Sequence, residues 1–174
     1  MPSVVMMDAA SAAPGDARDA LTDLTSAVGT LDPVSFWTVP AASASSGDLV
    51  IAGVTGVFLV AAYDREGVLT VDRGKPRVDG KPIPGLRGVR KDAKRLGSTL
   101  TAAQVFADVE PVVCLTRATV GAPRTVLGVR VVGLGDLTKD LTRRPTRIQH
   151  ARAQRVARAL GMQIAGDQRR HFVA

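Results

Sequence analysis

Cysteine and aromatic residues are scarce in this chain. Among its 174 residues there is one cysteine, Cys114, and aromatic side chains make up only 3%. A single cysteine excludes a disulfide framework and the zinc sites that are built on pairs of cysteines. The shortage of rings excludes an aromatic sugar-binding cleft and a base-stacking platform. The core must therefore consist of Val, Leu, Ile and Ala, and we interpret Cys114 as a small buried member of it.

Histidine and long apolar runs are also scarce. His150 and His171 both lie among arginines, so a Ser/His/Asp or Cys/His hydrolase is not favoured. A P-loop ATPase is disfavoured because the sequence has no Gly-x-x-x-x-Gly-Lys-Ser/Thr motif. The main apolar run without charge, residues 49–63, is shorter than the ~20 residues that span a bilayer as a helix, and residues 1–14 lack the basic start of a secretory signal. We expect a cytoplasmic protein with no membrane partner.

Charge is distributed unevenly along the chain. Residues 1–48 carry one base and six acids, a net charge of −5, whereas the remainder carries 22 bases and 10 acids, a net charge of +12. A basic body of this kind is typical of proteins that bind a polyanion such as DNA or RNA. The codon bias of a GC-rich genome is an alternative explanation, since arginines outnumber lysines 18 to 5.

Hydrophobic periodicity predicts a flexible leader at residues 1–14 and a single domain over residues 15–174. The expected helices and strands follow one another along that domain. Helices are expected at residues 16–29, 86–100, 137–141 and 148–160, strands at 36–39, 48–52, 57–63, 111–116 and 125–134, a small-residue linker at 41–47, and an exposed β-ribbon at 68–84. Strands interleaved with helices predict an α/β (α+β layered) fold, with a central mixed β-sheet flanked by helices.

The most informative segment runs from Asp48 to Tyr63. Two nearly continuous apolar runs, residues 48–52 and 57–63, flank the turn Gly53-Val54-Thr55-Gly56. Continuous runs of β-branched residues are typical of strands that are buried on both faces of a sheet. The segment therefore predicts a buried hairpin.

This hairpin and the pieces that follow it resemble the nuclease-related domain (NERD) family of the PD-(D/E)xK nuclease-like superfamily. The matching pieces after the hairpin are the ribbon, a Leu/Arg helix, Pro111-Val-Val-Cys-Leu115 and Gly128-Val-Arg-Val-Val-Gly-Leu134. The resemblance implies a restriction-endonuclease-like core. It also implies a site in which an acid on one strand and an acid plus a lysine on its hairpin partner hold Mg²⁺ and neutralise a phosphate.

The sequence departs from the family at the catalytic positions. Aligned on Gly56-Val57-Phe58, the first acid falls on Asp48, the second acid on Ala61 and the lysine on Tyr63. An alanine cannot bind a metal ion, and a neutral phenol cannot replace an ammonium group. We therefore expect a degenerate enzyme with no catalytic residues and no cofactor, in which Asp48 is either a vestigial metal ligand or a turn or cap residue.

A rearranged, active site that still binds Mg²⁺ is the alternative. Asp64, Glu66 and Asp72 lie just beyond the expected second acid. Strand parity argues against Asp64, because three residues beyond Ala61 in an unbroken strand point to the opposite face, although a bulge would restore it.

Two groups of basic residues are candidate nucleic-acid contacts. The first group lies on one face of the helix expected at residues 86–100, and the second lies in and before the last expected helix. The first comprises Arg87, Arg90, Lys91, Lys94 and Arg95, and the second comprises Arg147, Arg155 and Arg158. These groups predict a non-specific nucleic-acid-binding module, for DNA or RNA, that contacts phosphates. An ordinary solvated helix face explains them equally well, and a protein-interaction scaffold acting through the ribbon at residues 65–84 is the second functional hypothesis.

Overall fold

The computed structural model describes the backbone of residues 14–40 and 48–171 and the side chains of residues 18–40 and 48–161. The leader expected at residues 1–14 lies outside this part of the chain except for Pro14, and so does the linker expected at residues 41–47. In chain order the elements are α1 (Pro14–Val28), β1 (Phe36–Pro40), β2 (Asp48–Gly53), β3 (Gly56–Asp72), β4 (Lys75–Val78), β5 (Lys81–Pro82), α2 (Leu86–Ala102), β6 (Val109–Thr119), β7 (Arg124–Val126), β8 (Val129–Gly133), α3 (Leu134–Thr142) and α4 (His150–His171).

The strands form one mixed sheet in the order β1-β2-β3-β6-β8-β7, with β4 and β5 attached to the far end of β3. The first three strands are antiparallel neighbours, and the hairpin expected at residues 48–63 is present as β2 and β3. Strand β6 lies parallel to β3, and β8 lies parallel to β6. Parallel neighbours need a crossover, and α2 supplies it between β3 and β6.

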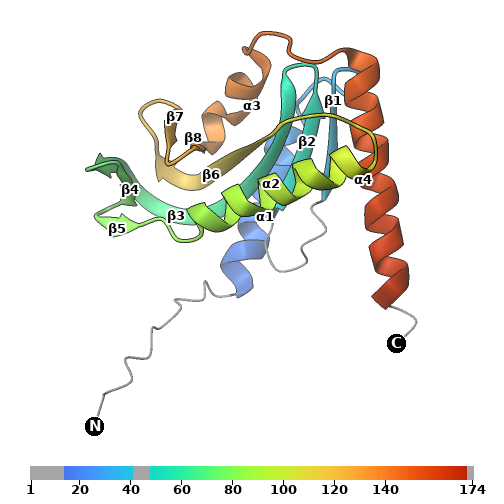
Figure 1. Cartoon of the computed structure of the whole chain (residues 1–174). Helices are drawn as coiled ribbons and strands as arrows, with labels where there is room; N and C mark the ends of the chain where they lie inside the picture. Colours follow the sequence, from blue (N-terminus) through green and yellow to red (C-terminus); the bar gives the residue numbers. More distant parts are fainter. Residues whose placement is uncertain (1–13, 41–47, 172–174) are drawn as a thin grey trace.

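Helices cover both faces of the sheet (Figure 1). On one face, α2 and α4 share a core with alternate side chains of the central strands, among them Val50, Leu59 and Val113. On the other face, α1 and α3 pack on the remaining side chains, among them Ile51 and the fully buried Phe58. The layered α/β fold with a mixed central sheet is therefore confirmed. The buried hairpin strands are apolar on consecutive residues because helices cover both of their faces.

Two predicted strand boundaries were wrong. The strand expected at residues 57–63 continues to Asp72, beyond a register shift between Tyr63 and Glu66, and its far end pairs with β4 to form the expected ribbon. The strand expected at residues 125–134 is a tight hairpin, β7 and β8, because Leu127 and Gly128 turn at φ values of 53° and 76°. An apolar leucine in the left-handed region gives no turn signal in the sequence.

The ribbon projects from one end of the sheet, beside the beginning of α2 (Figure 1). Its turn at Asp79-Gly80 has both residues at positive φ, and the Asp79 carboxylate accepts a hydrogen bond from the Val68 N–H at 2.8 Å. None of the helices in the described residues has the length and apolar character needed to cross a membrane.

Candidate nucleic-acid interface

Asp48 and Ala61 are directly paired across the β2–β3 hairpin. Residues directly opposite one another on antiparallel strands share a face, and Ala61 belongs to the core beneath α2 and α4. Asp48 begins β2 and is only 7% exposed, so it is not a solvent-facing turn residue. The positions that the resemblance assigns to the two carboxylates therefore adjoin each other, and only one of them bears an acid.

Tyr63 lies on the same face and packs partly buried against the same core. Burial raises the pKa of its phenol, and the neighbouring Asp48 carboxylate raises it further. The phenol oxygen also lies against Gly85, where any Cβ would overlap it. Gly85 caps the N-terminus of α2 at a φ of 77°, in the left-handed region that favours glycine, so it allows the phenol and the helix end to approach closely.

The metal ion implied by the resemblance does not fit these donors. Opposite Asp48 stands the methyl group of Ala61, and the lysine position carries a neutral phenol. Within residues 18–40 and 48–161, no group of three or more His, Cys, Asp and Glu side chains is placed to hold a metal ion.

Two of the carboxylates beyond Ala61, those of Asp64 and Glu66, form ion pairs with Arg117. The register of β3 with β6 shifts between Tyr63 and Glu66, so β3 is not an unbroken strand here and strand parity does not decide the face of Asp64. Asp64 accepts hydrogen bonds from Nε and Nη2 of Arg117, the second at 2.7 Å. Glu66 also pairs with Arg117, at 3.0 Å. These two ion pairs link β3 to β6 at the register shift.

Helix α2 carries the first group of candidate contacts as one exposed stripe. Leu86, Val89, Ala93 and Leu100 bury the opposite face of the helix. The stripe, which we call the α2 basic stripe, consists of Arg87, Arg90, Lys91, Lys94 and Arg95, and all five are exposed. At 1.5 Å of rise per residue it is about 12 Å long.

Two members of the stripe have local partners. Arg90 donates to the Leu127 carbonyl at 3.4 Å, and Arg95 lies 4.0 Å from Asp92. An exposed ion pair at that distance is weak, so the stripe keeps most of its positive charge. The other three members are Arg87, Lys91 and Lys94. Among the described side chains, none of them has a carboxylate oxygen within 4.0 Å of its charged nitrogens.

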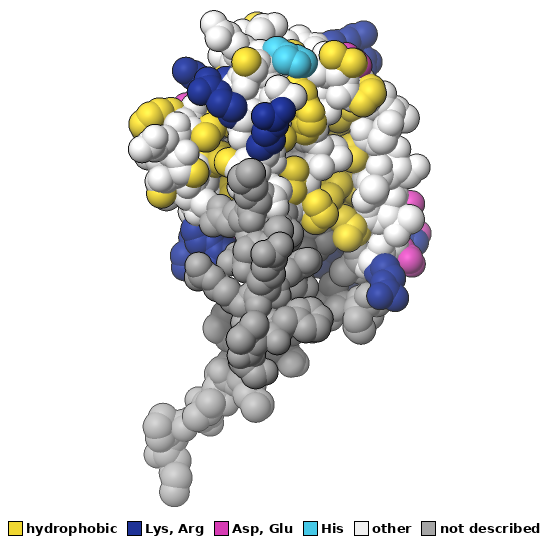
Figure 2. Space-filling view, turned by 90° about the vertical axis from the view of Figure 1, so that its right-hand side faces the viewer, with side chains coloured by type: hydrophobic (Ala, Val, Ile, Leu, Met, Phe, Trp, Pro, Cys, Tyr) yellow, Lys and Arg dark blue, Asp and Glu magenta, His cyan; other side chains and the backbone are white. Residues whose placement is uncertain are grey.

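The second group of candidate contacts is less coherent. Arg155 and Arg158 are exposed on α4, whereas Arg147 precedes that helix and lies 3.8 Å from Glu110. Figure 2 views the molecule from the side of α4 and shows Lys and Arg as separate spots, with hydrophobic side chains between them. The α2 basic stripe is therefore the more continuous of the two charged surfaces.

The sequence did not reveal a network centred on Asp140. Arg130 of β8 and Arg144 both pair with this carboxylate, and Arg144 also donates to Glu110 at 2.6 Å. The guanidinium of Arg144 lies over the Phe58 ring, 4.9 Å from its centroid. The only signal in the sequence is the i,i+4 spacing of Asp140 and Arg144; the other partners come together through the fold.

Comparison with known proteins identified no relative. Neither a family model, nor a curated protein, nor a solved structure matches this chain.

Proposed function

We propose that this protein is a catalytically degenerate nuclease-related domain that binds the phosphate backbone of DNA or RNA without sequence specificity. The observation that carries the proposal is the α2 basic stripe, five exposed cations on one helix face with one half-buried acid beside them. Duplex DNA carries one negative charge per ~1.7 Å of axis with both strands counted, so a length of duplex that matches the stripe, about 12 Å, carries about seven phosphate charges.

Phosphate contacts of this kind supply affinity without reading bases. None of the five side chains in the stripe is aromatic, so the stripe offers charge and hydrogen-bond donors rather than stacking surfaces. Binding should therefore depend steeply on salt and only weakly on sequence.

The degenerate half of the proposal is supported by the pairing of Asp48 with Ala61. A carboxylate faces a methyl group, where the nuclease-related pattern has a second carboxylate, and Tyr63 offers no positive charge to a phosphate. A protein with this arrangement would retain the fold and the binding surface and lack the metal clamp. We also propose a cytoplasmic location, on the grounds that Cys114 is the only cysteine and the chain is basic.

The proposal is tested by binding of a fluorescent duplex with 5′-hydroxyl ends, measured by anisotropy over a series of salt concentrations. If three to five members of the stripe contact phosphates, the slope of log K against log salt should be about −2.7 to −4.5. Duplexes of unrelated sequence should bind with equal affinity.

A slope near zero, or no binding, would refute nucleic-acid binding. That result would favour the alternative, a protein-interaction scaffold that uses the projecting ribbon at residues 65–84.

A further inference from the structure

The turn between β7 and β8 carries an exposed leucine in an unfavourable backbone conformation. Leu127 and Gly128 form a two-residue hairpin turn with φ values of 53° and 76°, and the Leu127 side chain is 54% exposed. Such a turn favours Asn or Asp followed by Gly, because a bulky side chain at positive φ crowds the backbone. Neither the turn nor the core therefore explains a leucine at this position.

The conformation of Leu127 is an exception among the described residues. Four non-glycine residues there have positive φ, and the other three, Arg73, Asp79 and Gln104, are polar. Backbone strain persists only where the surrounding structure holds it, and strained residues gather at sites that bind or react. The strain at Leu127 therefore directs attention to what its side chain contacts outside the protein.

The turn is firmly held on both sides. Val126 and Val129 flank it, pair with each other and are buried, at 7% and 1% exposure. The guanidinium of Arg90 lies against the turn: its Nη1 donates to the Leu127 carbonyl at 3.4 Å, and a Cβ at Gly128 would lie 3.4 Å from its Cζ. The leucine side chain therefore projects from a fixed turn, which reduces the entropy lost when it binds.

Arg90 also brings the turn to the α2 basic stripe. Arg87 precedes Arg90 by three residues and Lys94 follows it by four, so both adjoin it on the helix surface, with about 5–6 Å between Cβ atoms. All three cations are exposed. Leu127 is therefore an apolar side chain at the margin of a cationic surface.

A single apolar side chain beside cations suits duplex DNA better than a protein partner. A protein-binding patch consists of several contiguous apolar side chains. Among the described residues, α2, β7 and β8 expose no large hydrophobic side chain; Leu127, in the turn between the two strands, stands alone. Proteins that bend DNA combine phosphate contacts with an apolar wedge, such as a leucine, that separates two neighbouring base pairs.

We propose that Leu127 is a wedge that enters duplex DNA between neighbouring base pairs and bends it, while the α2 basic stripe holds the adjacent phosphates. This inference rests on the proposed function and adds a selectivity to it. Separating two base pairs costs least where one of them is mismatched. The protein therefore binds a duplex with a mismatch more tightly than a fully paired one, although no base edge is read.

The test compares a fully paired duplex with the same duplex carrying one central mismatch, using the full chain. Anisotropy measures the affinity, and energy transfer between dyes on the two duplex ends measures bending. Wild type should bind the mismatched duplex about threefold or more tightly and should shorten the distance between the ends. Leu127→Asn should bind both duplexes equally, leave them straight and keep the salt slope of wild type, because no charge is removed.

Two further variants and a stability measurement serve as controls. Leu127→Met keeps an apolar side chain and should keep both the bend and the mismatch preference. Val34→Thr replaces a methyl group by a hydroxyl on a side chain that is 66% exposed in the turn before β1, and it should change neither. Leu127→Asn should raise the midpoint of thermal unfolding by about 2 to 4 °C, because asparagine tolerates positive φ. Loss of bending in a more stable variant cannot result from unfolding.

The outcomes separate the wedge from the proposed function. Salt-dependent binding by wild type with no bend and no mismatch preference would overturn the wedge and leave the proposed function standing. No binding, or binding that is independent of salt, would overturn both. The wedge is also overturned if Leu127→Asn behaves like wild type. Sedimentation that shows a dimer for wild type and a monomer for Leu127→Asn would overturn it as well, because Leu127 would then serve a contact between two copies of the chain.

Discussion

Replacing Lys91 and Lys94 by glutamine should weaken nucleic-acid binding by an amount that the structure allows us to calculate. Both side chains are exposed on the α2 basic stripe, and neither has an ion pair in the described part of the chain. Glutamine has nearly the same helix propensity as lysine, and the buried face of α2 is unchanged, so the variant should fold normally.

The expected loss follows from counterion release. Each phosphate contact on a duplex contributes about 0.9 to the slope of log K against log salt, so removing both contacts should reduce the slope by about 1.8. Extrapolated from 1 M salt, one contact is worth about eightfold in affinity at about 0.1 M salt, and two contacts are worth about sixtyfold. Anisotropy of the same fluorescent duplex at several salt concentrations measures both quantities.

The matched control is Arg18→Gln/Lys75→Gln, which lowers the net charge equally but leaves α2 intact. Arg18 lies on α1, on the opposite face of the sheet, and Lys75 lies on the ribbon. Equal losses in the two variants would show that only net charge matters, and an unchanged slope in the α2 variant would refute the assignment of the stripe to phosphates.

Three other predictions concern buried or paired groups. Asp48→Asn should lower the pKa of Tyr63 toward its ordinary 10.0. Alkaline ultraviolet titration measures this pKa directly, because Tyr63 is the only tyrosine of the chain. An unchanged pKa would mean that the Asp48 charge does not act on the phenol. Because the folded pKa of Tyr63 is raised, the neutral phenol stabilises the wild-type fold below about pH 10, and this contribution is lost as the pH rises through the folded pKa. Asp140→Asn should reduce the free energy of unfolding at neutral pH by about 2 to 3 kcal/mol, because two largely buried arginines lose a charged partner. Because the folded pKa of Asp140 lies below its ordinary 3.8, its charge adds to the free energy of unfolding above that pH, and this addition is lost as the pH falls through the folded pKa. Urea unfolding at several pH values should show this loss in wild type and not in the variant. Parallel pH profiles of the two proteins would contradict the pairing. Burial raises the pKa of Cys114 to about 12, so this thiol should react with an alkylating reagent only after denaturation, and rapid modification of the native protein would show that the site opens.

The local signals in the sequence predicted the layered fold well. Continuous apolar runs at residues 48–63 gave the central hairpin, and the period of the basic and apolar residues gave α2 and its exposed stripe. Both signals are local, because burial on two faces or on one face of an element leaves a pattern within a dozen residues. The prediction that Asp64 faces away from Ala61 assumed an unbroken strand, and the register shift between Tyr63 and Glu66 removes that assumption.

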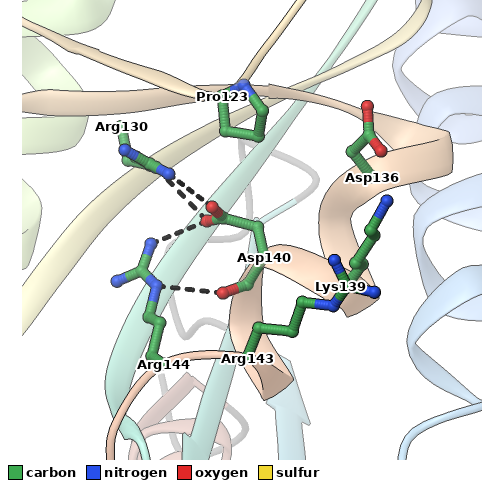
Figure 3. A pocket seen from close by; sticks show the side chains of 7 residues that line it. All are labelled: Pro123, Arg130, Asp136, Lys139, Asp140, Arg143 and Arg144. Carbon is green, nitrogen blue, oxygen red and sulfur yellow. Dashed lines mark hydrogen bonds and ion pairs between the residues drawn. The ribbon is translucent and has the colours of Figure 1, made fainter.

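Contacts between distant segments were not predictable in this way. The approach of Tyr63 to Gly85 depends on how the ribbon returns the chain to α2, and the Arg130, Asp140 and Arg144 network joins a strand, a helix and the loop after it. The turn at Leu127 was missed because a leucine at positive φ is held by its neighbours and not by its own preference. The arrangement of Arg130 and Arg144 around Asp140 (Figure 3) follows from such contacts, so only the structure identifies it.

The central claim is that the protein binds a duplex and cannot cleave it. The most direct test is to incubate an end-labelled duplex with excess protein and Mn²⁺ or Mg²⁺ and to separate the products on a denaturing gel. Because Asp48 faces the methyl group of Ala61, we predict that the labelled strand stays at full length while the duplex is bound. Shorter products that require the divalent ion, and that disappear with Asp48→Asn, would contradict the account.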